Sequence, residues 1–240
     1  MSRPHRFWLV SIGAIGGIVA TLALGQWQLG RGRAKDALQA AIDQRETMPV
    51  LAQSSLLQAS PGEFMNRQVV LHGAWDPAHT VFLDNRQMRG APGFYVVTPL
   101  KLEGSDRAVL VQRGWAPRNF EQREKLPPVD TPAGIVEISG RIAPPPARLY
   151  EFSGDERSAI RQNLDLASFR AETGLKLVDV SVVQAGPASE GLLRDWPRPA
   201  AGSERNYGYA VQWWAMSALI AILYVWFQFI APRRKVRPPQ

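Results

Sequence analysis

The chain has 240 residues, of which 45% are hydrophobic and 20% are charged, and it contains no cysteine. Apolar residues are plentiful enough for a buried core, which excludes a disordered chain. Without cysteine the protein has no disulfide, no thiolate metal site and no thiol nucleophile. Its three histidines, His5, His72 and His79, leave little for a histidine-rich metal site.

The net charge of +7 comes from the two ends of the chain. Residues 31–204 contain 21 acidic and 21 basic residues, and every acid of the chain lies in that stretch. The remaining basic residues are Arg3, Arg6, Arg205, Arg233, Arg234, Lys235 and Arg237. A nucleic-acid-binding protein would carry its basic excess on a folded face. We therefore expect no nucleic-acid partner.

Two long uncharged runs predict helices that cross a membrane. Residues 7–29 read FWLVSIGAIGGIVATLALGQWQL, and residues 207–230 read YGYAVQWWAMSALIAILYVWFQFI. At about 1.5 Å per residue, each run exceeds the roughly 30 Å of a bilayer's hydrocarbon core. Trp8 and Trp27 lie near the ends of the first run, where indole rings favour the membrane interface. The lipid bilayer is therefore an expected partner, and two buried helices of a soluble protein are the alternative.

The basic tails predict the topology. By the positive-inside rule, tails 1–6 and 231–240 are cytoplasmic. The two transmembrane helices, 7–29 and 207–230, then enclose a periplasmic, β-rich domain at 30–206. The first apolar run is longer than that of a signal peptide, and no clear cleavage site follows it. We therefore expect an uncleaved anchor in a cell inner membrane, with two helices and the main domain outside.

The stretch after the first apolar run begins with helical spacing. Ala37, Leu38, Ala41 and Ile42 recur at helical intervals and predict a helix that ends before Pro49. A second, short helix is expected over 163–174. The side chain of Asp165 can cap it, and Gly174 can end it.

From Gln68 on, outside the second of these helices, the apolar residues alternate with period two. The predicted strands are 68–75, 80–86, 93–102, 107–116, 135–142 and 175–185. Their close spacing, with turn residues between most of them, favours hairpins. The expected fold class is membrane α + β, with two transmembrane helices flanking a small antiparallel β-barrel or sandwich domain with short helices. Residues 186–204 are polar and rich in proline and glycine, which suits a linker.

The sequence shows no pattern typical of catalysis. In a hairpin of 68–75 with 80–86, His72 would face about Leu83 while His79 lies in the turn, so the histidines do not converge on a metal. No nucleophile motif, metalloprotease motif or phosphate-binding loop occurs. We therefore expect no enzyme and no bound metal.

Both apolar runs carry features that suit contact with another helix. Gly13 and Gly17 form a GxxxG spacing, which allows helices to approach closely, although glycine is common in membrane helices. The second run carries Tyr209 and Trp213 on an aromatic-rich face. That face packs on the first helix or on lipid, or it lines a flat hydrophobic ligand or a partner helix.

Four blocks of the sequence resemble the Surfeit locus protein 1 family. They are GQWQLGRGRAK at 25–35, WDPAHTVFLDNRQMRGAPGFYVVTPLKL at 75–102, VLVQRGWAP at 109–117 and YGYAVQWWAM at 207–216. Their order and spacing are those of the family and span nearly the whole chain. The resemblance implies an assembly factor for heme-copper (cytochrome c) oxidase. It would assist insertion of heme a into the catalytic subunit by binding and positioning, with heme a as a transient ligand.

The resemblance also implies partners and contact residues. The partners are the catalytic subunit of the oxidase, heme A synthase and other assembly factors. Candidate heme contacts are Tyr209, Gln212 and Trp213, on the last helix. Gln26 and Trp27, at the end of the first helix, are candidates for helix packing.

One position departs from the family pattern. Asn206 occupies the place where the family commonly has histidine before the last helix. Since asparagine is a poor axial ligand for heme iron compared with imidazole, the resemblance supplies no histidine ligand here.

Three arginines in the family-like blocks, Arg31, Arg86 and Arg113, are candidate contacts for heme propionates or for a partner. A guanidinium group suits bidentate pairing with a carboxylate. The alternative is ion pairing inside the domain, with Asp84 or Asp76. Two other function classes remain open: a periplasmic sensor or scaffold without a heme role, for which no output domain is expected, and a membrane-bound enzyme, for which no catalytic motif is found.

Overall fold

The computed structural model describes residues 3–58, 61–119, 121–122, 125–146, 158–197 and 202–231. The four basic residues of the predicted C-terminal tail, Arg233, Arg234, Lys235 and Arg237, lie outside the described residues. The chain forms two compact units. One comprises Met1–Ala41 with Arg198–Gln240, and the other comprises Ile42–Pro197. They are called here the helix unit and the β unit.

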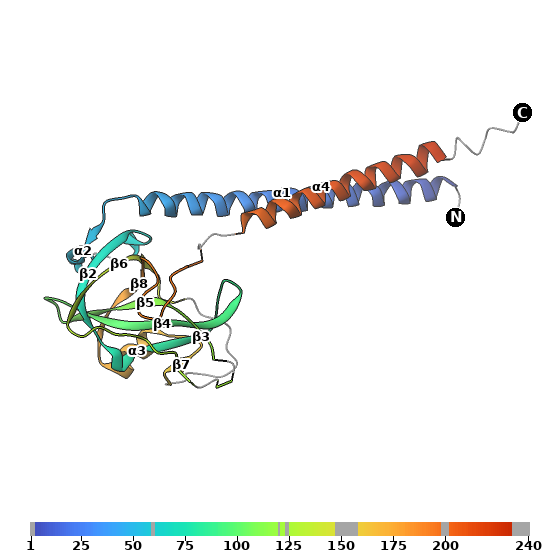
Figure 1. Ribbon diagram of the computed structural model, residues 1–240. Coiled ribbons are helices and arrows are strands. Elements are labelled where there is room, and N and C mark those ends of the chain that lie inside the picture. Colours follow the sequence, from blue (N-terminus) through green and yellow to red (C-terminus); the bar gives the residue numbers. More distant parts are fainter. Residues whose placement is uncertain are drawn as a thin grey trace, which may run out of the picture. The chain divides into compact units, whose positions relative to one another are not determined.

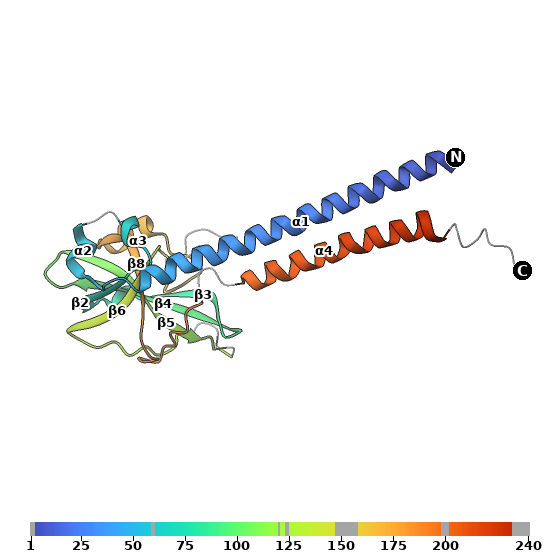
Figure 2. The ribbon, with the colours of Figure 1, turned by 90° about the horizontal axis from the view of Figure 1, so that it is seen from above.

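The helix unit is an antiparallel pair of long helices. Helix α1 spans Arg3–Glu46 and α4 spans Ser203–Val225, followed by a π-helical turn, η3, at Trp226–Ile230. The two helices run side by side (Figures 1 and 2). Both are long and apolar enough to cross a membrane, with windows of mean hydropathy 2.1 and 1.7. Helix α1 continues past the apolar run and ends before Pro49, which confirms the predicted helical extension.

The seam between the two helices follows a heptad-like pattern. The less exposed residues of α1 on this seam are spaced alternately by three and four positions: Ser11, Ala14, Ile18, Thr21, Gly25, Gln28, Gly32 and Lys35. On α4 the same spacing joins Ser203, Asn206, Ala210, Trp213, Ser217, Ile220 and Tyr224. A stripe with this period keeps one face of each helix against the other. Many of these residues are small or polar, which lets the helix backbones approach closely.

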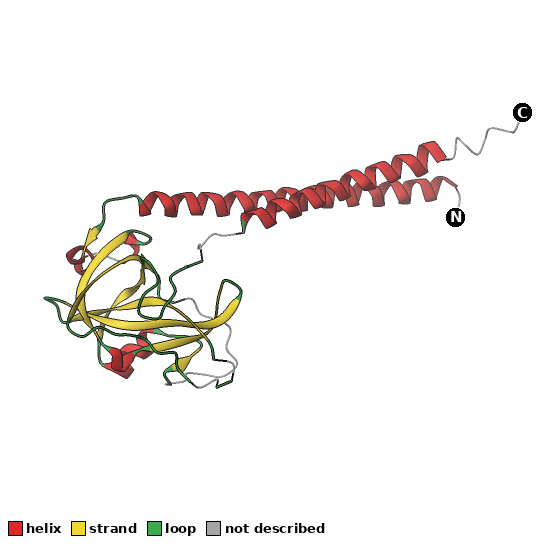
Figure 3. Cartoon of the chain, in the orientation of Figure 1, coloured by secondary structure: helices red, strands yellow, loops and turns green. Residues whose placement is uncertain are grey.

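Five strands of the β unit close into a barrel (Figure 3). They are β2 (Gln68–Trp75), β4 (Ala91–Leu102), β5 (Arg107–Pro117), β6 (Ile135–Ala143) and β8 (Lys176–Gln184). The pairings run β2–β6–β8–β5–β4, and a further pairing of β4 with β2 closes the ring. The predicted barrel is confirmed, but its expected antiparallel arrangement is only partly right, because β5 and β8 pair in parallel. After β5 the chain runs back along the barrel through β6, so β8 starts at the same end as β5 and runs parallel to it.

Short elements complete the β unit. The three remaining strands are β1 (Leu51–Ala52), β3 (Val81–Met88) and β7 (Ile160–Arg161). The short helices are α2 (Gln53–Gln58), η1 (Pro61–Phe64), η2 (Pro77–His79) and α3 (Leu166–Thr173). Strands β1 and β7 pair in parallel with β2 and β3, respectively, and sequence reasoning missed both. A two-residue strand is too short to produce an alternating pattern.

The predicted hairpin of β2 with β3 is wrong. The end of β2, at Gly73–Trp75, pairs with Leu100–Leu102 of β4, and β3 pairs with the earlier part of β4. The two strands therefore lie one after the other along β4. The turn at Asp76–Thr80 carries the chain onward along β4 instead of reversing it, because β4 has 12 residues and offers an edge to both strands. His72 consequently faces Glu137 of β6 and not Leu83.

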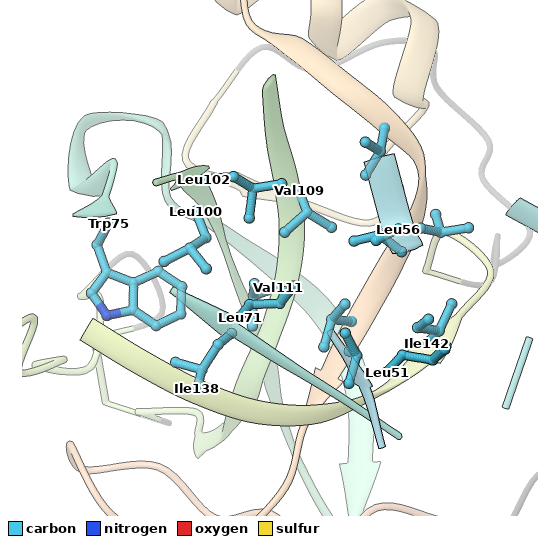
Figure 4. Packing of buried hydrophobic residues seen from close by; sticks show 14 residues of the cluster. Leu51, Leu56, Leu71, Trp75, Leu100, Leu102, Val109, Val111, Ile138 and Ile142 are labelled. Atoms are coloured by element: carbon cyan, nitrogen blue, oxygen red, sulfur yellow. The ribbon is translucent and has the colours of Figure 1, made fainter. Parts of the chain in front are cut away.

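The main core fills the barrel (Figure 4). Alternate residues of β2 point inward, so Val69, Leu71 and Trp75 are buried. Ile138 and Ile142 on β6 pack against them. Burying an aliphatic side chain of this size stabilises the fold by about 1.5–3 kcal/mol relative to leaving it exposed.

A smaller cluster lies beneath α3, around the buried Phe169. Asp165 caps this helix by accepting a hydrogen bond from the Ser168 backbone N–H, and Gly174 ends it in the left-handed region at φ 68°. Both predicted caps are confirmed.

Candidate functional site

Hydrogen bonds join α1 and α4 along their polar seam. They connect Ser11 with Tyr224, Ser217 with the carbonyl of Ile18, Asn206 with Gln28, Tyr207 with Asp36, and Lys35 with the carbonyl of Gly202. Between membrane helices, such bonds are worth about 0.6 kcal/mol each on average. Their number along one seam therefore holds the two helices in a single register.

Two glycines bring the helices close together at this seam. A Cβ at Gly25 would overlap the indole of Trp214, and a Cβ at Gly32 would come within 2.7 Å of the Tyr207 ring. The glycines predicted for helix packing lie elsewhere. A Cβ at Gly17 would make ordinary contact with Ile220 at 3.5 Å, and one at Gly13 would have nothing within 4 Å among the described residues. Close approach therefore depends on Gly25 and Gly32.

A pocket of about 350 Å³ opens where α4 begins. It is lined by Trp27, Gln28, Arg31, Lys35, Gly202, Arg205, Asn206 and Tyr209. All eight residues belong to the helix unit. On α1, Arg31 lies three positions after Gln28 and Lys35 lies seven positions after it, which places the three residues on one face of the helix. The volume falls within the roughly 300–1,000 Å³ range of small-ligand sites.

The lining of this pocket contains three cations and no carboxylate. The Arg31 guanidinium lies 5.3 Å from the centroid of the Trp27 ring, a cation–π arrangement. The Lys35 ammonium donates one long hydrogen bond, 3.3 Å, to the carbonyl of Gly202. Arg205 is exposed and has no ion-pair or hydrogen-bond partner among the described residues. The pocket lining is therefore positively charged, and its cations retain N–H donors for a ligand.

Asn206 is occupied within the helix pair. Its side-chain amide donates to Oε1 of Gln28 at 2.8 Å. The position at which the resemblance predicts a histidine is therefore a contact between α1 and α4 in this chain. The residue also lines the pocket, so its side chain lies beside the three cations.

The predicted heme contacts on α4 are partly brought together. Tyr209 is 52% exposed and lines the pocket just described. It also lines a second, neighbouring hollow together with Gln212, Arg205 and Gly208. Trp213 is half-buried on the seam and lines neither hollow. Tyr209 and Gln212 thus form one accessible surface beside Arg205.

The two residues predicted for packing at the end of the apolar run of α1 differ in environment. Trp27 is 53% exposed and forms a wall of the pocket. Gln26 is exposed and lines neither hollow. Neither lies on the heptad-like seam, but Trp27 lines the pocket together with residues of α4.

Arg113 lies in the interior of the β unit and is fully buried, with 0% of its side chain exposed. Its guanidinium stacks over Trp75 at 4.6 Å from the ring centroid and forms an ion pair with Glu190 at 3.0 Å. It also donates to the Thr131 hydroxyl and the Asp130 carbonyl. Its partners are therefore internal, and in this conformation a propionate from outside cannot reach it.

Part of the segment 186–204, which is predicted as a linker, packs on the barrel beside Arg113. Leu193 bridges to Trp115 of β5, and Leu192 is buried at 1% exposure. A Cβ at Gly114 would come within 2.6 Å of Leu192, so only glycine admits the segment there. Arg194 holds it further by donating to the carbonyl of Arg113. The polar composition of 186–204 predicts a linker and gives no indication that Leu192, Leu193 and Arg194 pack on the barrel.

Arg86, the third predicted arginine, is also buried, at 7% exposure. It donates to the carbonyl of Gln162 and lies over Tyr95, 5.8 Å from the ring centroid. Burial lowers the pKa of Arg86 and raises the pKa of Tyr95. Arg86 and Arg113 belong to the β unit, whereas Arg31 belongs to the helix unit.

The two carboxylates considered as alternative partners have other cations. Asp84 pairs with Arg118 at 3.0 Å. Asp76 accepts from Lys101 at 2.9 Å and from the imidazole of His79 at 3.1 Å. Burial pushes the pKa of Asp76 upward, but the hydrogen bonds from Lys101 and His79 outweigh burial, so the pKa lies below its ordinary value.

The two histidines of the β unit are paired with carboxylates. His72 pairs with Glu137 at 3.0 Å and His79 with Asp76. No group of three or more potential metal ligands is found in the part of the chain that the structure describes. None of the three histidines lines the pocket between α1 and α4.

Sequence reasoning missed two of the three cations of that pocket, Lys35 and Arg205. The signal was present in the spacing: Lys35 lies one heptad after Gln28, and Arg205 directly precedes Asn206. From the sequence, Arg205 is assigned only to the basic excess at the ends of the chain.

Comparison with known proteins gives one family. The model of the SURF1 family matches residues 16–218. A SURF1-like protein of Rickettsia felis is 27% identical over 214 residues, covering 85% of this chain and 90% of that protein. Surfeit locus protein 1 of Homo sapiens is 28% identical over 233 residues, covering 88% and 74%. Cytochrome oxidase assembly protein SHY1 of Saccharomyces cerevisiae is 28% identical over 98 residues, covering 40% and 25%.

Proposed function

This chain belongs to the SURF1 family, and we propose on that premise that it is an assembly factor for a heme-copper (cytochrome c) oxidase. The observation that carries the proposal is the match of the family model over residues 16–218, which include most of the helix seam, the pocket and the whole β unit. One relative is named as a cytochrome oxidase assembly protein. The role is binding and positioning and requires no bond making.

The proposed location is a cell inner membrane. Helices α1 and α4 span it through the uncharged runs 7–29 and 207–230, with both termini cytoplasmic and residues 30–206 in the periplasm. The mean hydropathy of both helices and the basic ends of the chain support this topology.

Heme a is the proposed cargo, delivered to the catalytic subunit of the oxidase. Its propionates would meet Arg31, whose guanidinium faces the pocket without a carboxylate partner among the described residues. Tyr209 and Gln212 would contact the macrocycle, and Trp213 would support the helix face from the seam. Arg86 and Arg113 would act instead by keeping the β unit folded.

The absence of an imidazole beside the pocket fits a cargo better than a resident cofactor. Asn206 is engaged with Gln28, and an amide is a weak ligand for heme iron. Heme a held only by propionate and aromatic contacts would leave readily to a protein that offers histidine ligands. The proposed partners are that catalytic subunit, heme A synthase and other assembly factors.

The test compares two arginines of α1 that lie two positions apart. Arg31→Gln removes a cation from the pocket, and Arg33→Gln removes the same charge from an exposed position outside it. Each variant replaces the wild type in the cell, and the heme a content of the purified oxidase is measured. We expect a lower heme a content with Arg31→Gln and a normal content with Arg33→Gln. Equal heme a content in both strains would overturn the propionate assignment.

A further inference from the structure

The cation cluster of the pocket extends beyond the single arginine assigned above. Arg31, Lys35 and Arg205 converge on one cavity whose described lining has no acid. Among the carboxylates close by in sequence, Asp36 accepts a hydrogen bond from Tyr207, and Glu204 does not line the cavity. Three cations gathered without a counter-charge repel one another, and an anionic ligand removes that repulsion.

The position of the pocket along the helices restricts the kind of anion. Its residues on α1 run from Trp27 to Lys35, across the point where the uncharged run ends at residue 29. On α4 they run from Gly202 to Tyr209, across the start of the second uncharged run. Both helices therefore change from charged to apolar within the pocket. In a bilayer this is the depth of the lipid headgroups.

The aromatic walls suit the same depth. Trp27 and Tyr209 are each about half exposed, and both line the pocket beside the cations. Such rings, apolar with one polar atom, favour the headgroup region of a membrane. They offer an apolar surface to the glycerol and first methylenes of a lipid whose phosphate meets the cations.

We propose that this pocket binds the phosphate of an anionic phospholipid headgroup. Basic pockets between membrane helices on the cytoplasmic side bind such headgroups, and we assign the same chemistry to this pocket at the periplasmic end of the two apolar runs. The Arg31 and Arg205 guanidinium groups offer paired donors to the phosphate oxygens, and Lys35 adds a point charge. The proposal rests on the membrane location proposed above and is independent of the heme role, although Arg31 would serve both ligands.

The test uses the full chain in neutral detergent micelles and native mass spectrometry. Phosphatidylglycerol and phosphatidylcholine are added at equal concentration, and the bound fraction of each is measured. We expect the wild type to retain phosphatidylglycerol over phosphatidylcholine. Since a cation near a membrane surface contributes enough to change binding about fivefold, Arg205→Gln should weaken phosphatidylglycerol binding by about that factor. Arg33→Gln, the matched control outside the pocket, should bind it nearly as the wild type does.

Three outcomes would overturn the proposal. The first is equal retention of the two lipids by the wild type, and the second is an equal loss in Arg205→Gln and Arg33→Gln. The third is displacement of phosphatidylglycerol by inorganic phosphate at equal concentration, which would assign the pocket to free phosphate. Because no oxidase and no heme are present, failure here leaves the assembly role untouched, and failure of the heme test leaves the lipid site untouched.

Discussion

Asn206 of α4 donates a hydrogen bond from its side-chain amide to Oε1 of Gln28 on α1, at 2.8 Å. The two residues are 178 positions apart in the sequence, yet they join the helices at the edge of the positive pocket. The position at which the sequence resemblance led us to expect a histidine therefore carries an asparagine with a specific partner on the opposite helix.

This contact predicts a coupling between the two positions. Gln28→Ala and Asn206→Ala should each lower the stability of the helix pair, and the double variant should lose less than the sum. We expect a coupling of about 0.6 kcal/mol, the mean for hydrogen bonds between membrane helices. Unfolding of the full chain in mixed micelles by a denaturing detergent measures all four proteins. Strictly additive losses would show that the bond contributes nothing.

Restoring the family's histidine should change heme binding. Asn206→His places an imidazole at the wall of the pocket, where it can act as an axial ligand to heme iron. We expect the purified variant, incubated with heme a, to give the absorption spectrum of a histidine-ligated heme, and the wild type to lack that signature. The same spectrum in both proteins would place the ligand elsewhere in the chain.

The close approach of α1 to α4 predicts a contrast between two glycines. Gly25→Ala inserts a methyl group into the volume of the Trp214 indole, so the helices must separate or the ring must move. Overpacking of this kind costs about 1–3 kcal/mol. Gly30→Ala, with nothing within 4 Å, should instead gain up to about 1 kcal/mol of helix propensity. Thermal unfolding in micelles, followed by circular dichroism, should show opposite shifts in Tm; shifts of the same sign would contradict the packing.

The buried network around Arg113 predicts a large loss on substitution. Arg113→Met leaves Glu190 without its innermost cation and removes the stacking on Trp75. Breaking a buried ion pair from one side costs about 3–5 kcal/mol. Arg89→Gln is the control, because that arginine is 70% exposed in its pair with Asp195 and should change stability by about 0–1 kcal/mol. Urea unfolding of the full chain measures both, and a loss for Arg113→Met no larger than that of the control would contradict a structural role.

The Asp76 cluster predicts a dependence on acid pH. The pKa of Asp76 is below its ordinary value in the folded protein, so its ionised form adds stability above about pH 4. That contribution is lost as the pH falls through the folded pKa. Asp76→Asn should therefore be less stable than the wild type at pH 6, and the difference should shrink below about pH 4. A difference independent of pH between 3 and 7 would contradict the assigned ionisation.

Alternation predicted the strands of the β unit well but not their pairing. Residues 68–75 alternate in burial as expected, and β2 has the predicted bounds. The pattern of one strand, however, does not say which neighbour it takes. Asp76 and Pro77 are as compatible with a hairpin turn as with a bend after which the chain continues along β4. The length of β4, which accommodates both β2 and β3, decides between them.

The candidate site was predictable only where spacing along a helix carries the information. Arg31, Asn206 and Tyr209, each named from the sequence, line one pocket in the structure. The burial of Arg113 could not be predicted in this way, because an arginine in a predicted strand is expected to be exposed unless its internal partners are known. Its main partner, Glu190, lies in the segment predicted as linker, 77 residues further along the chain. Contacts of that separation leave no local pattern.

The proposed role of the protein is in oxidase maturation. The most direct measurement of that role is a reduced-minus-oxidised spectrum of membranes from a strain lacking the gene, beside its parent and a strain carrying the gene again. We expect a lower or shifted a-type heme band in the deletion strain, restored by the wild-type gene. An unchanged band, with the oxidase polypeptides present at parental level, would contradict it.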